Sequence, residues 1–455
     1  MSGMLGNAGL NIEESKLKMM NSILKRILKK ITPDKNILGI IDRQVEILNR
    51  LLAEKHIGAE CVKGGSVAKD TFLKDDFDAD LFIRFDLDYK DKDISNIVED
   101  ILNRLHHPIE RIHGSRDYFH FVNKKINYEI VPVLKVHPSN VSSAQNVTDL
   151  SPEHVFWVKK HTDKNPVLKN EIRIAKQFCK ANEVYGAESY IKGFSGHIID
   201  ILVIYFGSFI KLITAFSSIK NVSLNHPIII DPENHQSDPL QDLNSSKLSP
   251  LIIIDPIQKD RNAAAALSQE KLMTFMSACK NFLENPSDKY FVTQKFDLRK
   301  SISFSKKTLK RNNKEKFKIL IMKITALSGS KDVVGTKILK VYEDIIKQLT
   351  LSNFNVLISN WHFDFEKKKA EIFLILPKNG LSEYYEQEGP PLSSKLDCNN
   401  FYDKHMKHKT LIRNDRLYAI VPRKYPQPED FLQDLFKKDF IKSRIQKITL
   451  VKTAE

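Results

Sequence analysis

The sequence predicts a multidomain α+β protein, because secondary-structure signals change twice along the chain. The first 140 or so residues mix short strands with amphipathic helices, residues 152 to about 279 are mostly helical, and strands return after Phe296. At 455 residues the chain is too long for one compact core. We place the domains at residues 1–145, 146–280 and 281–455.

Hydrophobic periodicity assigns the individual elements. Apolar residues that recur every three to four positions predict helices in the first domain at 16–31, 34–57 and 93–105. Alternating apolar residues predict strands there at 59–64 and 78–85 and a strand pair at 118–136. A polar stretch at 231–250 is expected to be a surface loop within the helical domain. The third domain should contain strands at 317–324, 354–365 and 370–376, a helix at 335–349 and a turn at 388–394.

The composition indicates which partners and compartment to expect. Lys and Arg total 71 against 56 Asp and Glu, for a formal charge of +15, which favours a polyanionic partner such as nucleic acid. The alternative is a surface that is merely rich in lysine. The four cysteines lack the spacing of zinc ligands or of a redox pair. No apolar run approaches the roughly 20 residues of a membrane span, and the N-terminus lacks a signal-peptide pattern. We therefore expect a cytoplasmic protein without a membrane partner.

Three aspartates precede a strongly apolar strand. In an extended chain Asp76, Asp78 and Asp80 would share one face, while Leu81 and Ile83 continue the other face into the core. Like charges at this spacing repel each other, so a fold keeps them at a cost or neutralises them with a cation. Mg²⁺ is the natural candidate, because it prefers oxygen ligands and retains waters and substrate phosphates. A solvated acidic loop is the alternative for the aspartates alone.

The Gly-Gly-Ser corner before the aspartates makes the interpretation more specific. Gly64 and Gly65 allow a tight turn and close approach of a ligand, and Ser66 offers a hydroxyl. A helix that starts here would direct free N–H groups at phosphate oxygens. A phosphate-binding corner followed by paired carboxylates is what metal-assisted nucleotidyl transfer requires. Glu129, a lone acid within a predicted strand, is the candidate for a third carboxylate.

The segment "GGSVAKDTFLKDDFDADLFIRF" resembles the nucleotidyltransferase core of the polymerase-beta type, and more narrowly the archaeal-type (class I) CCA-adding enzymes. "TDLSPEHVFWV", "NEIRIAKQFCKANEVYGAESYIKGFSGHIIDILVIYFGSF" and "DPIQKDRNAAAALS" are similar to this family's helical neck, and "EGPP" to its C-terminal third. The resemblance implies a nucleotidyltransferase head, a helical neck that completes the nucleotide pocket, and a mixed α/β body and tail that bind the tRNA acceptor stem.

The resemblance also implies functional residues in the head. Asp78, Asp80 and Glu129 match the catalytic metal ligands, although the third is usually Asp in this family. Ser66 matches a serine that contacts the nucleotide phosphates. Lys69 stands where the family has an arginine, so it should bind phosphate as a point charge without the bidentate fork.

In the neck, His154, Lys176 and Tyr185 match nucleotide-contacting positions of the family. Lys176 can neutralise triphosphate oxygens, Tyr185 can stack or hydrogen-bond near the sugar, and His154 can donate to a phosphate or to the ribose. Arg261 precedes an alanine run and is our candidate for reading the base edge of C or A.

The resemblance thus implies an enzyme that adds C, C and A to the 3′ end of tRNA with CTP, ATP and Mg²⁺ and releases pyrophosphate. A poly(A)-type template-independent nucleotidyltransferase is the first alternative, and a noncatalytic RNA-binding protein is the second. The oligomeric state stays open, with a homodimer among the options.

Overall fold

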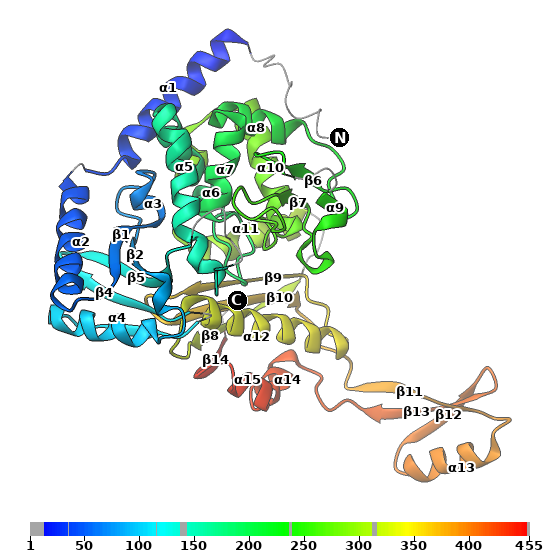
Figure 1. Cartoon of the computed structure of the whole chain (residues 1–455). Coiled ribbons are helices and arrows are strands. Elements are labelled where there is room, and N and C mark those ends of the chain that lie inside the picture. Colours follow the sequence, from blue (N-terminus) through cyan, green and yellow to red (C-terminus); the bar gives the residue numbers. More distant parts are fainter. Residues whose placement is uncertain are drawn as a thin grey trace. The chain divides into compact units, whose positions relative to one another are not determined.

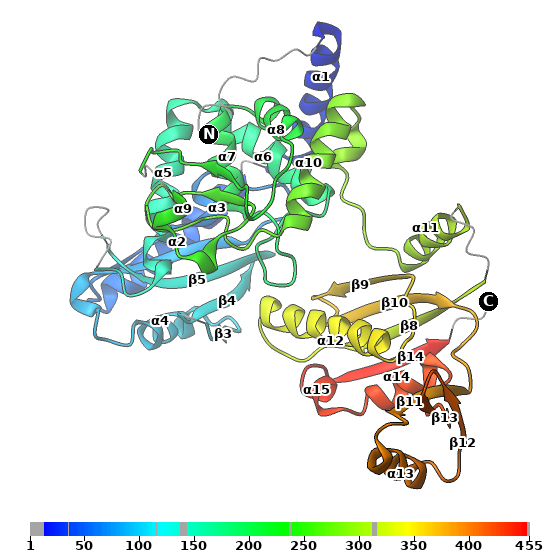
Figure 2. The same cartoon turned by 90° about the vertical axis from the view of Figure 1, so that its right-hand side faces the viewer.

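The computed structural model describes residues 13–34, 36–114, 116–136, 143–235, 239–311 and 316–452. The N-terminal residues 1–12, which belong to the segment searched for a signal peptide, lie outside these ranges. The chain divides into two compact units, Met1–Gln294 and Lys295–Glu455. Figures 1 and 2 show the elements of each unit from two sides. The three domain boundaries expected from the sequence remain a prediction.

A five-stranded sheet forms the N-terminal part of the first unit, in the order β1-β2-β5-β4-β3. Strands β2 and β5 pair in parallel, and the other neighbours are antiparallel. The predicted strands and helices of this part are confirmed within a few residues. They are α1 (Glu14–Ile31), α2 (Asn36–Glu54), β1 (Ala59–Lys63), α3 (Gly65–Ala68), β2 (Ala79–Phe85), α4 (Ile94–Leu102), β4 (Tyr118–Asn123) and β5 (Ile126–Leu134); the short strand β3 (Glu110–Ile112) was not predicted.

The two faces of this sheet have different partners. Leu81, Ile83 and Phe85 of β2 pack with α2 and α4, which cover one face (Figure 1). Phe82 and the β5 residue Val131 belong to the opposite face and pack against α5. Because side chains alternate along a strand, Asp80 and Glu129 lie on this second face, toward the helical region.

The helical region has its own core, which is rich in phenylalanine and includes residues of α1. A parallel strand pair, β6 with β7, was not predicted from the sequence. Part of the expected loop at 231–250 is also helical, as α9 and a 3-10 turn at Ser245–Lys247, although residues 236–238 lie outside the described ranges. The elements are α5 (Ser151–Lys164), α6 (Val167–Ala181), α7 (Gly196–Phe206), α8 (Phe209–Ser218), β6 (Ile228–Ile230), α9 (Pro239–Asp242), β7 (Leu251–Ile253) and α10 (Gln269–Glu284).

The second unit contains a four-stranded sheet in the order β14-β8-β10-β9, with α12 on one face and α11 on the other (Figure 2). A three-stranded sheet, β11-β13-β12, packs with α13. The turn expected at 388–394 is partly wrong, because residues 388–391 end the edge strand β11 at a bulge; prolines are tolerated at such positions. The elements are α11 (Leu298–Arg311), β8 (Phe317–Thr325), α12 (Lys331–Leu351), β9 (Ile358–Asp364), β10 (Lys369–Pro377), β11 (Tyr384–Pro391), α13 (Lys395–Lys404), β12 (Lys409–Arg413), β13 (Arg416–Pro422), α14 (Pro428–Leu435), α15 (Asp439–Lys442) and β14 (Lys447–Lys452).

Among the helices that the structure describes, none alone has the length and apolar character of a membrane span. By length and composition only, α7 and α8 taken together pass the same test, with a bend of 93° between them.

Candidate active site

Two carboxylates meet on the neighbouring strands β2 and β5. Asp80 is directly opposite Glu129 in the parallel register, and Asp78 lies one residue before β2. His120 of β4 is opposite Glu129 on the other side, with its Nε2 3.0 Å from Glu129 Oε2. This hydrogen bond raises the pKa of His120. The expectation that Asp76 shares the strand face is wrong, because β2 begins at Ala79 and Asp76 pairs with Lys180 at 2.7 Å.

The glycine corner packs directly against this carboxylate edge. The Gly64 amide donates to the Asp80 carbonyl at 2.7 Å. Gly65 has φ +50°, and a Cβ built on it would lie 1.6 Å from Asp80 Oδ2. Glycine is therefore required here for conformation and for space. The expected helix after the corner is a single turn, α3, which carries Ser66 and ends at Ala68, with Lys69 as its C-cap.

The electrostatics of the three carboxylates fit a cation site. Burial, together with the charges of Glu129 and Asp78, raises the pKa of Asp80 to about 7, although Lys69 and Lys176 oppose the shift. A carboxylate in this state is neutral for part of the time near neutral pH, and a bound cation would make its ionised form favourable. All three side chains supply the hard oxygen ligands that divalent cations prefer.

Two lysines of the predicted phosphate site share one buried carboxylate. Lys69 Nζ lies 2.5 Å from Asp200 Oδ2, and Lys176 Nζ lies 3.2 Å from Asp200 Oδ1. Lys176 also donates to Thr71 Oγ1 at 2.9 Å. Burial lowers the pKa of Lys176 to about 8, against the opposing effect of Asp200. Burial would raise the pKa of Asp200, but the two lysines outweigh it and the net shift is downward. The pair of lysines thus joins α3 of the sheet region to α6 and α7 of the helical region.

Tyr185 lies beside the same helices. A Cβ built on Gly196, the first residue of α7, would lie 3.1 Å from Tyr185 Oη and 4.0 Å from Lys176 Nζ. Lys180 Nζ is 4.5 Å from the centre of the Tyr185 ring. Burial raises the pKa of Tyr185, so its hydroxyl stays protonated and available as a donor. Glycine at 196 therefore lets the tyrosine hydroxyl approach the start of α7.

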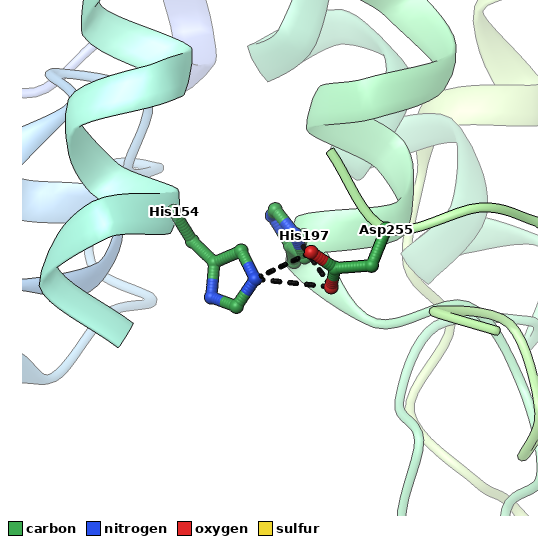
Figure 3. Close-up of side chains that lie close together, drawn as sticks. All are labelled: His154, His197 and Asp255. Carbon is green, nitrogen blue, oxygen red and sulfur yellow. Dashed lines mark hydrogen bonds and ion pairs between the residues drawn. The ribbon is translucent and has the colours of Figure 1, made fainter. Parts of the chain in front are cut away.

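Two histidines and Arg261, from different elements, converge at Asp255, and Figure 3 shows the two histidines beside this carboxylate. His154 of α5 has its Nε2 2.8 Å and 3.0 Å from the two Asp255 oxygens, and an Arg261 NH1 donates to Oδ2 at 2.7 Å. His197, in the first turn of α7, has its Nε2 4.0 Å from Oδ2. Among the described residues, three potential metal-ligand atoms lie within 4.8 Å of one another at His154, His197 and Asp255, and not at the strand carboxylates.

The structure therefore groups the residues singled out in the sequence into three clusters. The carboxylates Asp78, Asp80 and Glu129 form the first group, Lys69 and Lys176 meet at Asp200, and His154 and Arg261 meet at Asp255. Ser66 and Tyr185 lie beside the first and second groups.

Sequence reasoning missed four of the residues that assemble this site: Thr71, His197, Asp200 and Asp255. Two of them had a detectable signal. Asp200 interrupts the run "HIIDILV" and Asp255 follows "LIII", and a lone acid in an apolar segment must be paired when it is buried. The partners, however, lie far along the chain and could not be named from the pattern.

Three family models match the chain. They are a nucleotidyltransferase domain at residues 41–146, the second domain of tRNA nucleotidyltransferase at 170–292 and the C-terminal domain of CCA-adding enzymes at 318–443. The first covers the carboxylate sheet, and the second covers Lys176, Asp200 and Asp255.

Curated relatives match over most of the chain. A CCA-adding enzyme of Nanoarchaeum equitans is 32% identical over 368 residues, which cover 80% of this chain and 83% of the relative. A CCA-adding enzyme of Saccharolobus shibatae is 30% identical over 88% of this chain and 89% of the relative. One from Methanocaldococcus jannaschii is 28% identical over 95% and 93%.

Solved structures share the fold at low sequence identity. A structure of the Cid1 poly(U) polymerase with magnesium and 3′-dATP has a TM-score of 0.50 and 12% identity, covering 61% of this chain and 99% of that one. Another Cid1 structure also has a TM-score of 0.50, covering 62% and 100%. The sheet and helices of the first unit thus have a nucleotidyltransferase fold, which implies dependence on a divalent metal ion.

Proposed function

The chain belongs to the family of archaeal CCA-adding enzymes, and from this premise we propose how its side chains carry out nucleotide addition. It is a tRNA nucleotidyltransferase that adds C, C and A to the 3′ end of tRNA with CTP and ATP. Each step joins the tRNA 3′ hydroxyl oxygen to the α-phosphorus of the nucleotide and breaks the bond to pyrophosphate. The register that sets Asp80 beside Glu129, next to the Gly64-Gly65 corner, is the observation that carries the assignment of the reacting centre.

Asp78, Asp80 and Glu129 would hold the divalent metal, which we propose to be Mg²⁺. When bound, it stabilises the attacking oxygen and the leaving pyrophosphate as a Lewis acid. The paired strands β2 and β5 hold Asp80 and Glu129 side by side, so metal binding requires no rearrangement of the backbone at these two residues. His120 holds Glu129 through its 3.0 Å hydrogen bond and restricts the longer side chain that replaces the family's usual aspartate.

Ser66, Lys69 and Lys176 bind the triphosphate. In this structure the Asp200 carboxylate neutralises the positive charges of both lysines. When a nucleotide binds, its phosphate oxygens would neutralise part of this positive charge. Both ammonium groups act as point charges and contact phosphates that are common to CTP and ATP. This part of the site therefore contributes affinity without selecting a base.

Tyr185, His154 and Arg261 contact the sugar and base of the nucleotide. The Tyr185 hydroxyl lies near the start of α7, which supports its proposed contact with the sugar. Arg261 is about one-third exposed, so part of its guanidinium can face a ligand while one nitrogen binds Asp255. On their pairing edges C and A present an exocyclic amine beside an unprotonated ring nitrogen, whereas U and G present a carbonyl beside a ring N–H, so the two pairs of bases can be distinguished.

The tRNA acceptor stem and 3′ end are bound by the basic second unit together with the first. Double-stranded RNA is recognised by shape and backbone contacts, which suits an enzyme that accepts every tRNA. We propose the division into head, neck and body-tail at residues 1–145, 146–280 and 281–455, and a cytoplasmic location. The chain could also form a homodimer, and analytical ultracentrifugation would measure its oligomeric state.

Product sequencing tests this function. Purified protein is incubated with a tRNA that ends at the discriminator base, with each nucleotide alone and with all four. We expect C, C and A in that order and growth that stops at CCA. Long oligo(A) tails would favour a poly(A)-type enzyme, and RNA binding without incorporation would favour a noncatalytic protein.

Substitution of the metal ligands tests the reacting centre. Asp78→Ala or Asp80→Ala should abolish transfer while the fold and tRNA binding are retained, because each removes a cation ligand. Circular dichroism and tRNA binding serve as the controls. Near-normal turnover of either variant at saturating Mg²⁺ would contradict the assignment.

A further inference from the structure

The Asp255 carboxylate accepts more hydrogen bonds than a carboxylate that only closes an ion pair. Its Oδ1 accepts from His154 Nε2 and from the backbone amides of Ile257 and Gln258, at 2.8 to 3.1 Å. Its Oδ2 lies within hydrogen-bonding distance of His154 and accepts from Arg261. These partners come from α5 and from the loop after β7. Asp255 therefore fixes two side chains and a loop at one point.

Backbone hydrogen bonds also hold the loop between Asp255 and Arg261. The Asp255 amide donates to the Arg261 carbonyl at 3.0 Å, and the Arg261 amide donates to the Gln258 carbonyl at 3.0 Å. The buried Asn262 accepts from the Ile253 and Ala264 amides. The Arg261 backbone is thus held by backbone hydrogen bonds to Asp255 and Gln258, while the direction of its side chain depends on the Asp255 carboxylate.

The same contacts argue against a metal ion at His154, His197 and Asp255. A carboxylate with five close contacts has no free lone pair, and a cation would have to displace the Arg261 guanidinium at 2.7 Å. Like-charge repulsion from that guanidinium disfavours a cation further. His154 is already directed at Asp255 through Nε2, the atom that would bind the metal (Figure 3).

His197 indicates where a ligand would enter. Both of its ring nitrogens are buried and make no hydrogen bond within the described structure. Its ring lies 4.5 Å from that of His154. Burial lowers the pKa of His197 to about 3, so the ring is neutral at physiological pH and offers one donor and one acceptor. A buried donor and a buried acceptor without hydrogen-bond partners lower the stability of the fold. A polar ligand or a water beside Arg261 and His154 could supply the missing hydrogen bonds to His197.

We propose that Asp255 is a positioning residue for base selection: it holds Arg261 and His154 in the orientation that reads the incoming nucleotide, without contacting that nucleotide itself. This inference rests on the proposed function and names the device that fixes its selective side chains. An arginine held by a buried carboxylate is oriented before the nucleotide arrives, which increases discrimination between bases. Triphosphate affinity, which depends on Lys69 and Lys176, is independent of Asp255.

A mutant cycle tests the proposal. Selectivity is measured as two ratios. The first is kcat/KM for CTP divided by kcat/KM for UTP, on tRNA that lacks CCA. The second is kcat/KM for ATP divided by kcat/KM for GTP, on tRNA that ends in CC. Both ratios are measured for wild type, Asp255→Asn, Arg261→Ala and the double variant. We expect Asp255→Asn to lower selectivity by about five- to a hundredfold, the range for a lost buried hydrogen-bond partner. The double variant should lose no more than Arg261→Ala alone, because Asp255 affects base choice through Arg261, whereas His154 would contact a phosphate or the ribose, which all four nucleotides share.

Unchanged selectivity in Asp255→Asn, or independent losses that multiply in the double variant, would overturn the proposal. Asp288→Asn is the matched control, since it removes another Asp–Arg pair, with Arg26 at 2.7 Å, from the same unit; it should leave selectivity unchanged. If Asp255→Asn does not fold, Arg261→Lys keeps the charge beside Asp255 and loses the guanidinium fork. That variant must then lose selectivity, and wild-type selectivity in it would overturn the proposal.

Two further measurements separate the remaining explanations. Metal analysis of the purified protein should find no zinc at this cluster. One zinc per chain that is lost in both Asp255→Asn and His197→Leu would overturn the proposal in favour of a metal site. The wild-type reaction separates this inference from the proposed function. If wild type adds no CCA, the function itself fails, whereas CCA addition with unchanged selectivity in Asp255→Asn removes only the role of Asp255.

Discussion

Gly65 is the residue at which backbone conformation and catalytic geometry depend most directly on each other. Its φ of +50° and the 1.6 Å from a built Cβ to Asp80 Oδ2 mean that any side chain would displace the carboxylate. We expect Gly65→Ala to lower kcat by about a hundredfold, the cost of moving a catalytic group by an ångström. Gly207→Ala is the matched control, because Gly207 has φ +77° and nothing within 4 Å of its Cβ position. It should cost about 1 kcal/mol of stability and leave kcat unchanged. Equal kcat in both variants would contradict this account.

Substitutions at Glu129 test whether the third acidic position of the site must carry a negative charge or need only be polar. If it is a metal ligand, Glu129→Gln should lower the rate by about two to three orders of magnitude. Glu129→Asp should be tolerated, because aspartate is the family's usual residue and keeps the charge. Single-turnover rates at several Mg²⁺ concentrations measure both variants. Full activity of Glu129→Gln would mean that another acid has this role.

At the scale of elements, α6 supplies a lysine, Lys176, whose charge is sensitive to pH and which pairs with Asp200 of α7. Burial lowers the pKa of Lys176 to about 8, so the free enzyme loses this charge as the pH rises through that value and keeps it below. Because kcat/KM reports groups of the free enzyme, it should fall above pH 8 for CTP and ATP alike. In Lys176→Arg the fall should move to higher pH, since arginine stays charged. An identical pH profile in that variant would show that another group titrates.

The sequence predicted elements well where their patterns are long. Strand β2 and the pair β4–β5 follow from alternation, and α2 follows from its periodic apolar residues. Strands β6 and β7 escaped prediction because three-residue apolar strands cannot be distinguished from short helical segments.

For the site, the local carboxylate motif was predictable, whereas contacts between distant segments were not. Lys69 and Asp200 are separated by 131 residues, and His154 and Asp255 by 101. A single sequence gives no information on such pairing, even where a lone buried acid indicates that some partner exists. The carboxylates that hold Lys176 and Arg261 therefore emerged only from the folded structure.

At the scale of the whole molecule, the two units have separate cores, so nucleotide binding and RNA binding can be separated by truncation. Every predicted nucleotide contact lies within Met1–Gln294, whose sheet and helical cores contain none of the described residues of Lys295–Glu455. We expect a fragment ending at Gln294 to bind CTP and ATP like the full chain. Its affinity for tRNA should be lower by at least about tenfold, because the fragment lacks the phosphate contacts of the second unit.

Salt dependence makes this comparison quantitative. Each lost phosphate contact lowers the slope of log affinity against log salt by roughly 0.7 to 0.9. Fluorescence anisotropy with labelled tRNA between about 50 and 200 mM salt, the range over which such contacts change affinity strongly, gives both slopes. The full chain, with its formal charge of +15, should have the steeper slope. Unimpaired nucleotide binding by the fragment is the control that shows the fragment is folded. Equal slopes and equal affinities for the fragment and the full chain would then mean that the second unit does not bind the acceptor stem.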